Sequence, residues 1–149
     1  MKLYVLRHGN AEFMAASDAQ RELTPRGESE TRVIVSGSDT LKGVSVIIAS
    51  PYVRAQQTAA IVGDQLGLEV VTSDLLVPEA SIEAVVDYLQ SMEGETPLLV
   101  SHQPFVGHFI NWLADLDPGR HIMGTSALAE LNVEVLARGC ADLVSLKQP

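Results

Sequence analysis

The chain has 149 residues, of which 46% are hydrophobic and 19% are charged, a balance that is typical of one globular domain and excludes a disordered chain. The formal net charge of −9 disfavours a nucleic-acid binder and a binder of anionic membranes, because both need a basic surface. The single cysteine, Cys140, leaves no disulfide within the chain, which fits a reducing compartment.

The first apolar run, residues 3–6, predicts a buried strand. It is too short for a secretory signal, which needs about 7–15 apolar residues, and no later run approaches the ~20 residues of a membrane span. We therefore expect a cytoplasmic protein without a membrane-bound part. After this strand, a Thr-Pro pair predicts a helix over residues 25–41, because threonine caps helices and proline suits the first helical position.

The next strand is expected over residues 44–49, a run rich in β-branched side chains. Ser50, followed by proline, repeats the capping signal and predicts a second helix. This helix is expected to continue to Leu66 and to end at Gly67, since glycine is the residue that most often follows a helix. Residues 69–72 form a weaker strand candidate.

A third helix is expected after Ser81, with apolar residues at positions 82, 85, 86 and 89 on one stripe. Residues 98–100 predict another buried strand. Pro104 then opens a fourth helix, whose apolar stripe is expected to extend to Leu116. The middle of the chain thus continues the alternation of strands and helices.

Two later strand candidates, residues 127–133 and 142–146, are expected to be antiparallel and near an edge of the sheet. Since the earlier strands alternate with helices, the sequence predicts an α/β fold, a three-layer α/β/α sandwich with a mostly parallel central sheet. We expect residues 1–149 to form a single domain, and the small size favours a monomer.

Basic side chains follow three of the predicted parallel strands, at the point where each strand ends. Arg7 and His8 follow the first strand, Arg54 follows the second and His102 follows the central one. Because the carboxyl ends of parallel strands meet at one edge of a sheet, we expect these residues to converge. Arg21, in the loop after the first strand, is a further candidate. Converging guanidinium groups predict a site for a multiply charged anion such as phosphate.

The two histidines suit phosphoryl transfer. An imidazole is neutral and nucleophilic at neutral pH, and a backbone carbonyl could hold one ring N–H of His8, in a tight turn beside Gly9. His102 is expected to serve as a cation or a hydrogen-bond donor to the transferring group. Such a set supplies alignment and charge neutralisation, so we expect neither a metal nor another cofactor. His108 and His121 are expected to be surface residues.

Three stretches carry these residues: Leu6-Arg7-His8-Gly9, Ser50-Pro51-Tyr52-Val53-Arg54-Ala55-Gln56-Gln57-Thr58 and Val100-Ser101-His102-Gln103-Pro104. Together they resemble the signatures of the histidine phosphatase (phosphoglycerate mutase-like) superfamily. The short length and a further set of residues are similar to the SixA-type phosphohistidine phosphatases within it. That set is Ser17-Asp18, Arg21, Leu23-Thr24 and Gly27.

The resemblance implies that His8 is transiently phosphorylated and that Arg7, Arg54 and His102 bind the phosphoryl group, with Arg21 as a further contact. It also implies a signalling substrate phosphorylated on histidine. Such substrates include the phosphotransfer domain of a sensor kinase and a sugar-phosphotransferase carrier. Glu79 lies in roughly the region where larger members of the superfamily place an acidic proton donor. It is equally interpreted as a carboxylate near a helix start, where the helix dipole favours negative charge.

Two alternatives stay open. One is a phosphatase of a small phosphate ester, and the other is a non-catalytic phosphohistidine-binding module in signalling. The chemistry of the leaving group separates the first from a phosphohistidine phosphatase. An imidazole leaves with a pKa of about 6.5, whereas an alkoxide resembles hydroxide, whose parent water has a pKa of about 15.7. An ester therefore needs a general acid such as Glu79 far more than phosphohistidine does.

Overall fold

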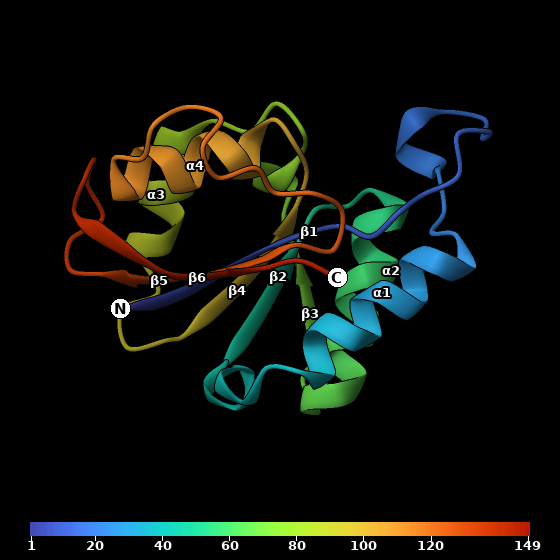
Figure 1. Cartoon of the computed structure of the whole chain (residues 1–149), viewed down its shortest axis with the longest axis horizontal. Helices are drawn as coiled ribbons and strands as arrows, with labels where there is room; N and C mark the ends of the chain where they lie inside the picture. The colour runs from blue at the N-terminus through green and yellow to red at the C-terminus, as the bar shows by residue number, and fades with distance from the viewer.

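A six-stranded sheet runs through the middle of the computed structural model, which describes residues 1–149 (Figure 1). The strands span Lys2–Arg7 (β1), Val46–Ala49 (β2), Val70–Thr72 (β3), Pro97–Ser101 (β4), Leu128–Val133 (β5) and Ala141–Lys147 (β6). Their order in the sheet is β3-β2-β4-β1-β5-β6. The first four strands are parallel to their neighbours among themselves, whereas β5 and β6 are antiparallel. The predicted, mostly parallel sheet with late antiparallel strands at one edge is confirmed.

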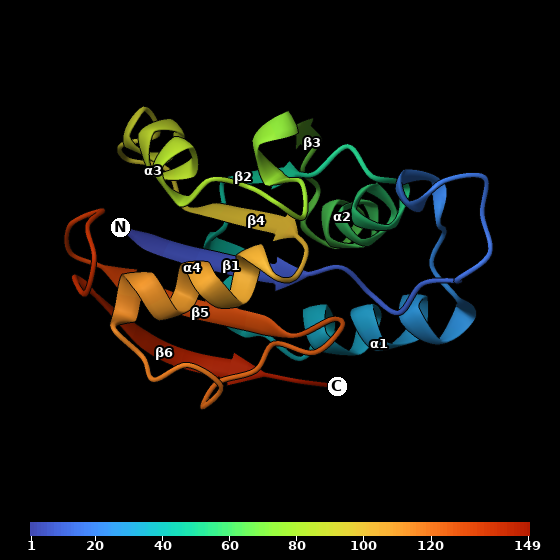
Figure 2. The same cartoon turned by 90° about the horizontal axis from the view of Figure 1, so that it is seen from above.

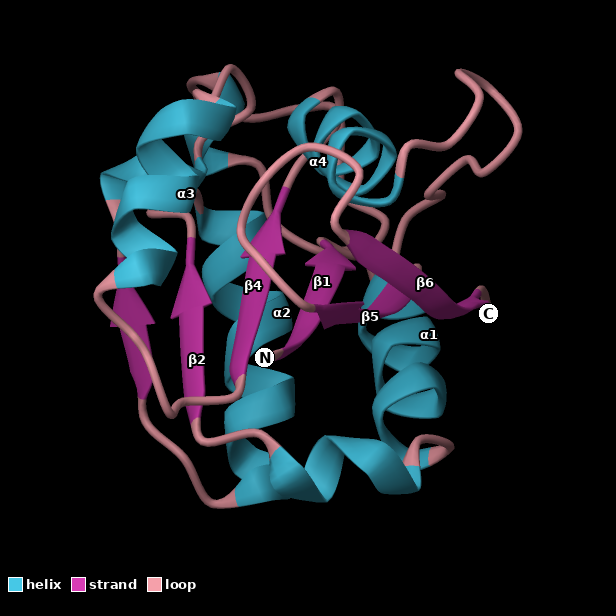
Figure 3. Cartoon of the chain, turned by 90° about the vertical axis from the view of Figure 1, so that its left-hand side faces the viewer, coloured by secondary structure: helices cyan, strands magenta, loops and turns pink.

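Helices cover both faces of this sheet (Figures 2 and 3). They span Pro25–Ser36 (α1), Val53–Leu66 (α2), Ile82–Gln90 (α3) and Phe105–Ala114 (α4). Alternate side chains of a strand point to opposite faces, and β1 therefore contributes to two cores. Leu3 and Val5 pack with side chains from α3 and α4, while Tyr4 and Leu6 pack with side chains from α1 and α2. The three-layer α/β/α sandwich is confirmed.

The central strand β4 is buried along its whole length. Leu99 packs into the core that α3 and α4 cover, and Leu98 and Val100 pack into the opposite core. Burial of each such side chain stabilises the fold by about 1.5–3 kcal/mol relative to exposure. A strand buried on both faces has no polar side, which explains the continuous apolar run in the sequence. The sheet thus gives the residues at its carboxyl edge a rigid base.

Several predicted helix boundaries are confirmed, because the local capping interactions form. The Thr24 hydroxyl accepts a hydrogen bond from the Gly27 N–H at the start of α1. The Ser81 hydroxyl accepts one from the Ala84 N–H at the start of α3. Gly67 ends α2 in the left-handed region with φ of 70°. The two capping hydroxyls and the left-handed glycine thus mark these ends as the sequence predicted.

Other predicted boundaries are wrong. α1 ends at Ser36 and not near residue 41, because the Gly37 N–H turns back to carbonyls of the last turn and a separate 3-10 turn, Asp39–Gly43, follows. That turn buries Leu41, whose apolar character had suggested a longer helix. α4 ends at Ala114 and does not reach Leu116, because the backbone enters the left-handed region at Asp115.

The start of α2 also differs from the prediction. The helix begins at Val53 with Tyr52 as its cap, and Ser50 lies two residues further back. Ser50 directly follows β2, and its hydroxyl contacts His102, which directly follows β4. The serine that the sequence marks as a helix cap therefore belongs to the site.

The carboxyl ends of β1, β2 and β4 lie next to one another, as their parallel register requires. From β1 the chain enters a loop that projects beyond α1 and α2 before it returns to α1 (Figure 1). An isolated pairing of Ala11 with Leu23 closes the base of this loop. None of the helices combines the length and the apolar character that crossing a bilayer requires.

Gly27 fixes the path of this loop, and its replacement is expected to destabilise the fold. A Cβ at Gly27 would lie 2.1 Å from the Asn10 carbonyl oxygen. We expect Gly27→Ala to lower the free energy of unfolding by at least about 1–3 kcal/mol, measured by urea unfolding followed by circular dichroism. Gly43→Ala is the matched control, because a Cβ there meets nothing within 4 Å. Equal unfolding midpoints for the two variants would contradict this close packing.

Candidate active site

His8 sits directly after β1, and its backbone is held on both sides. Its N–H donates to the Ser101 carbonyl at the end of β4, and its carbonyl accepts from the Ser126 N–H. The side chain is 6% exposed. Because the end of β4 and the segment just before β5 both bond to this residue, the backbone of His8 has a defined position at the carboxyl edge.

The orientation of the His8 ring follows from one hydrogen bond. Its Nδ1 lies 2.7 Å from the Gly9 carbonyl oxygen. A carbonyl only accepts, so Nδ1 carries the proton and the neutral ring keeps its lone pair on Nε2. Arg54 Nε donates to this Nε2 over 3.3 Å. The sequence did not tell which ring nitrogen of His8 attacks an electrophile. The structure indicates Nε2, because Nδ1 carries the proton.

Gly9 is needed at this point because the loop packs closely against α1. A Cβ on Gly9 would lie 2.9 Å from both the Gly27 carbonyl oxygen and the Thr31 hydroxyl. The glycine thus lets the loop pack against α1. Its N–H donates to the Thr58 hydroxyl, which in turn donates to the Arg54 carbonyl. This chain of contacts ties the His8 turn to the first turns of α2.

Arg54 projects from the first turn of α2 and is 4% exposed. Besides its contact to His8, its guanidinium donates through Nη1 to the Asp18 carbonyl oxygen over 2.6 Å and through Nη2 to the Asp18 carboxylate over 3.2 Å. The Tyr52 ring lies 5.1 Å from the guanidinium carbon. The fork is thus oriented by a histidine on one side and a carboxylate on the other.

His102 follows β4 and faces His8, with 5.1 Å between the ring centroids. Its Nε2 lies 2.7 Å from the Ser50 hydroxyl oxygen, which also accepts from the Tyr52 N–H. The hydroxyl has a second acceptor position and a proton of its own, so either atom of the contact can be the donor, according to the tautomer of His102. The other ring nitrogen of His102, Nδ1, is buried and has no partner.

Arg7 and Arg21 complete the cationic set. Arg7 Nη1 donates to the Met123 carbonyl, while its buried Nε has no partner. Arg21 Nε donates to the Glu12 carbonyl, and its Nη1 contacts the Asp18 carboxylate at 3.0 Å. Asp18 therefore bridges Arg21 and Arg54. Its part in the site was missed, because only the resemblance had drawn attention to this position.

Burial and positive neighbours control protonation in the site. Burial lowers the pKa of His8 to about 4, with further lowering by the charges of Arg54 and Arg7. Burial lowers the pKa of His102 to about 3, and His8 and Arg54 add to this effect. The hydrogen bond from Arg21 lowers the pKa of Asp18. At neutral pH His102 is thus a neutral hydrogen-bonding group and not the cation that the sequence also allowed.

One cavity brings all six predicted site residues together. It has a volume of about 410 Å³, and its lining includes Arg7, His8, Arg21, Arg54, Glu79 and His102. Asp18 and Phe13 also line it. Glu79 is exposed at this cavity and makes no hydrogen bond or ion pair. His108 is exposed as predicted, and His121 is half-buried, and neither lines the cavity.

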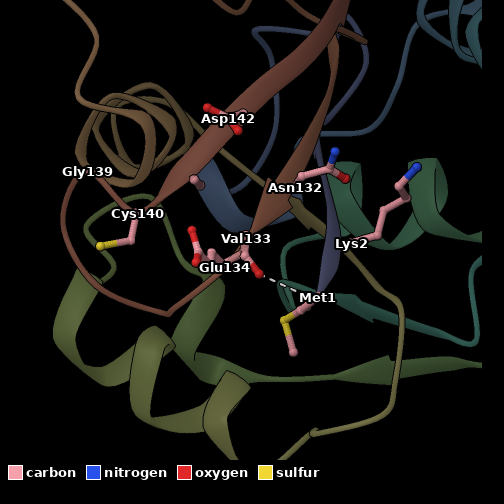
Figure 4. A pocket seen from close by; sticks show the side chains of 9 residues that line it. Met1, Lys2, Asn132, Val133, Glu134, Gly139, Cys140 and Asp142 are labelled. Carbon is pink, nitrogen blue, oxygen red and sulfur yellow. Dashed lines mark hydrogen bonds between the residues drawn. The ribbon is translucent and has the colours of Figure 1, made fainter.

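A second cavity of about 410 Å³ lies at the opposite end of β1, around the amino terminus (Figure 4). The amino group of Met1 donates to the Val133 carbonyl there over 2.8 Å, and Glu134, Cys140 and Asp142 stand nearby. It contains no arginine or histidine. No three histidine, cysteine, aspartate or glutamate side chains of the protein are grouped as metal ligands. Of these two cavities, only the first contains histidine and arginine side chains.

Comparisons with known proteins agree with this geometry. Residues 3–77 match the family model of the histidine phosphatase superfamily (branch 1). The chain is 35% identical over 150 residues to the phosphohistidine phosphatase SixA of Escherichia coli (strain K12), covering 93% of this chain and 89% of that protein. It is 33% identical over 123 residues to the SixA homolog of Haemophilus influenzae, covering 74% and 75% of the two chains.

The fold agrees as well. The structure of the protein histidine phosphatase SixA complexed with tungstate superimposes with a TM-score of 0.88 at 32% identity, covering 100% of this chain and 97% of that one. The matched family model includes the stretches that carry Arg7, His8 and Arg54. The chain belongs to the histidine phosphatase superfamily, branch 1.

Proposed function

We propose that this protein is a phosphohistidine phosphatase that acts through a phosphorylated His8. The observation that carries the proposal is the neutral His8 ring, held through Nδ1 by the Gly9 carbonyl, with its Nε2 against Arg54. The resemblance to the phosphohistidine phosphatase SixA over 93% of the chain supports the choice of substrate. The four residues at the three strand ends, Arg7, His8, Arg54 and His102, have the roles proposed below.

The proposed reaction has two displacement steps. In the first, the Nε2 lone pair of His8 attacks phosphorus, and the electron pair of the breaking P–N bond leaves with the substrate imidazole, which takes a proton from water. In the second, water attacks the phosphorus of phospho-His8 and gives up a proton to the solvent. The P–N bond to His8 breaks, inorganic phosphate leaves, and the electron pair returns to Nε2, so that the His8 ring regains its neutral form. The first step moves the phosphoryl group from one nitrogen to another, and the second moves it to a water oxygen. Neither step changes an oxidation state, so no redox partner is needed.

Charge neutralisation falls to the residues around His8. The guanidinium groups of Arg7 and Arg54 stabilise the phosphoryl oxygens as negative charge develops on them. The buried Nε of Arg7 and Nδ1 of His102 have no hydrogen-bond partner in the free protein, and we propose that both donate to phosphoryl oxygens. The Asp18 carboxylate forms an ion pair with Arg54 in the free protein, and this ion pair has to break in part when the substrate binds.

The leaving group also favours phosphohistidine. A substrate imidazole needs little protonation to leave, because its pKa is about 6.5. Glu79 is exposed and has no hydrogen-bond partner that aims its carboxyl group at the cavity. A site with a poorly positioned acid suits a P–N bond. Glu79 nevertheless lines the same cavity as His8, and this observation favours the second candidate, a phosphatase of small phosphate esters.

We further propose that residues 1–149 form one domain, because both cores share the same sheet. The substrate class that we propose is a cytoplasmic histidine-phosphorylated protein, such as a sensor-kinase phosphotransfer domain or a sugar-phosphotransferase carrier. An acidic chain with a net charge of −9 does not favour nucleic acid as a partner. The proposal includes a monomer that works without a metal.

His8→Ala is expected to abolish phosphate release from a histidine-phosphorylated protein, because the variant lacks the imidazole nitrogen that the proposed reaction uses as the nucleophile. Rapid acid-free quenching of the wild type with ³²P-labelled substrate should trap an acid-labile, base-stable label on the enzyme. The label should be absent from His8→Ala and present in His108→Ala, whose histidine is exposed on α4. Label on an aspartate or serine would exclude the proposed intermediate.

Glu79→Gln is expected to lower kcat on phosphohistidine protein less than about tenfold, because the imidazole leaves without strong acid assistance. The same variant should be compared with the wild type on a panel of sugar phosphates and nucleotides. A loss of about a hundredfold or more on an ester that the wild type hydrolyses faster than phosphohistidine would favour the second candidate function.

Stability is expected to fall as the pH is lowered from about 6.5 towards about 4, because His8 and His102 resist protonation when folded and take protons when unfolded. Their contribution is complete above the unfolded pKa and decreases below it. Urea unfolding at about pH 7.5 and about pH 5 measures this difference. His8→Asn and His102→Asn should each shrink it, whereas His108→Asn should not. Identical differences in all four proteins would contradict the assigned protonation.

A further inference from the structure

Two large apolar side chains stand in water beside the proposed active site. Phe13 is 89% exposed and Met14 is 90% exposed, the highest values among the exposed large hydrophobic residues of the chain. Single exposed apolar residues are common on protein surfaces. An adjacent pair is different here, because Phe13 also lines the cavity that contains His8. Two consecutive exposed apolar side chains, Phe13 and Met14, thus stand on the loop beside the cavity, and we call them the apolar patch.

The loop that carries the patch is held in place on both sides. The Glu12 N–H donates to the Glu22 carbonyl over 2.8 Å, and Arg21 Nε donates to the Glu12 carbonyl over 2.6 Å. The pairing of Ala11 with Leu23 closes the loop next to these bonds. These contacts join residues 11–12 to residues 21–23 at the base of the loop, which projects from the body of the molecule (Figures 1 and 2).

The patch is also connected to the anion-binding residues. The guanidinium carbon of Arg21 lies 5.5 Å from the centre of the Phe13 ring. The same guanidinium contacts Asp18, which contacts Arg54. A cation over an aromatic face is a favourable contact, and it places the ring at the rim of the proposed phosphoryl site. A molecule whose phosphoryl group reaches Arg54 therefore brings its neighbouring surface against Phe13 and Met14.

We propose that Phe13 and Met14 are the docking patch for the protein that carries the phosphohistidine. The occupant is an apolar surface next to the phosphorylated imidazole of that protein, and this inference rests on the proposed function. A small phosphorylated imidazole fills the cavity but has no surface that reaches Met14. The patch thus selects a protein substrate over a free phosphoramidate.

Charge supports an apolar contact as the source of affinity. The chain has a net charge of −9, and the docking loop itself carries the carboxylates of Glu12 and Glu22. Long-range attraction of an acidic phosphoprotein by such a surface is weak. Removal of apolar surface from water does not depend on the sign of charge, and it acts once the two surfaces meet. The patch therefore supplies apolar contact area in addition to the small cationic cavity.

Met14→Ser is the main test, because Met14 does not line the cavity. The probes are an isolated phosphotransfer domain phosphorylated on its histidine and phosphoimidazole. We expect Met14→Ser to raise KM for the phosphoprotein roughly tenfold with little change in kcat, and Phe13→Ser to raise it by a similar factor. Met14→Ser should leave KM for phosphoimidazole unchanged. Val135→Ser, which removes another exposed apolar side chain at 57% exposure, should change neither KM.

The possible outcomes separate this inference from the proposed function. If the wild type hydrolyses both probes and Met14→Ser matches Val135→Ser on the phosphoprotein, the docking patch is refuted and the phosphatase stands. If Met14→Ser raises KM for both probes equally, the residue acts on the small-molecule site and the docking role is also refuted. If the wild type hydrolyses neither probe, the proposed function itself fails. Thermal unfolding of each variant checks that the fold is intact.

Discussion

The site depends on the hydrogen bond between His8 Nδ1 and the Gly9 carbonyl, 2.7 Å long. It fixes the tautomer of the ring, and the backbone contacts of His8 with Ser101 and Ser126 fix the position of the ring. A neutral imidazole with its lone pair on Nε2 is useful only beside groups that bind phosphoryl oxygens. The parallel sheet supplies those groups, because it brings the ends of β1, β2 and β4 to one edge.

Concentrated positive charge has to be balanced while the site is empty. Asp18 provides that balance, since its carboxylate contacts both Arg21 and Arg54. Burial and the nearby cations keep His8 and His102 neutral, which preserves the nucleophile and avoids adding charge to the cluster. An arriving phosphoryl group then competes with one carboxylate for guanidinium contacts, within an acidic chain that has few other cationic places for a polyanion.

Much of this arrangement follows from the sequence, because strand periodicity and the geometry of parallel sheets together determine where strand-end residues meet. Arg7, His8, Arg54 and His102 were placed in this way. The contact of Asp18 with Arg54 joins positions 36 residues apart through a projecting loop, and no local pattern encodes it. Ser50 matches a helix cap in the sequence, yet the helix begins only at Val53, and the Ser50 hydroxyl contacts His102, a residue 52 positions away that no local pattern pairs with it.

The central claim is that the phosphoryl group passes through Nε2 of His8. Nitrogen-15 NMR of the trapped phosphoenzyme, with labelled histidine, measures it most directly, because one-bond coupling to phosphorus identifies the modified ring nitrogen. The account predicts coupling at Nε2 of a single histidine, and loss of that signal in His8→Asn. Coupling at Nδ1, or at a histidine other than His8, would contradict it.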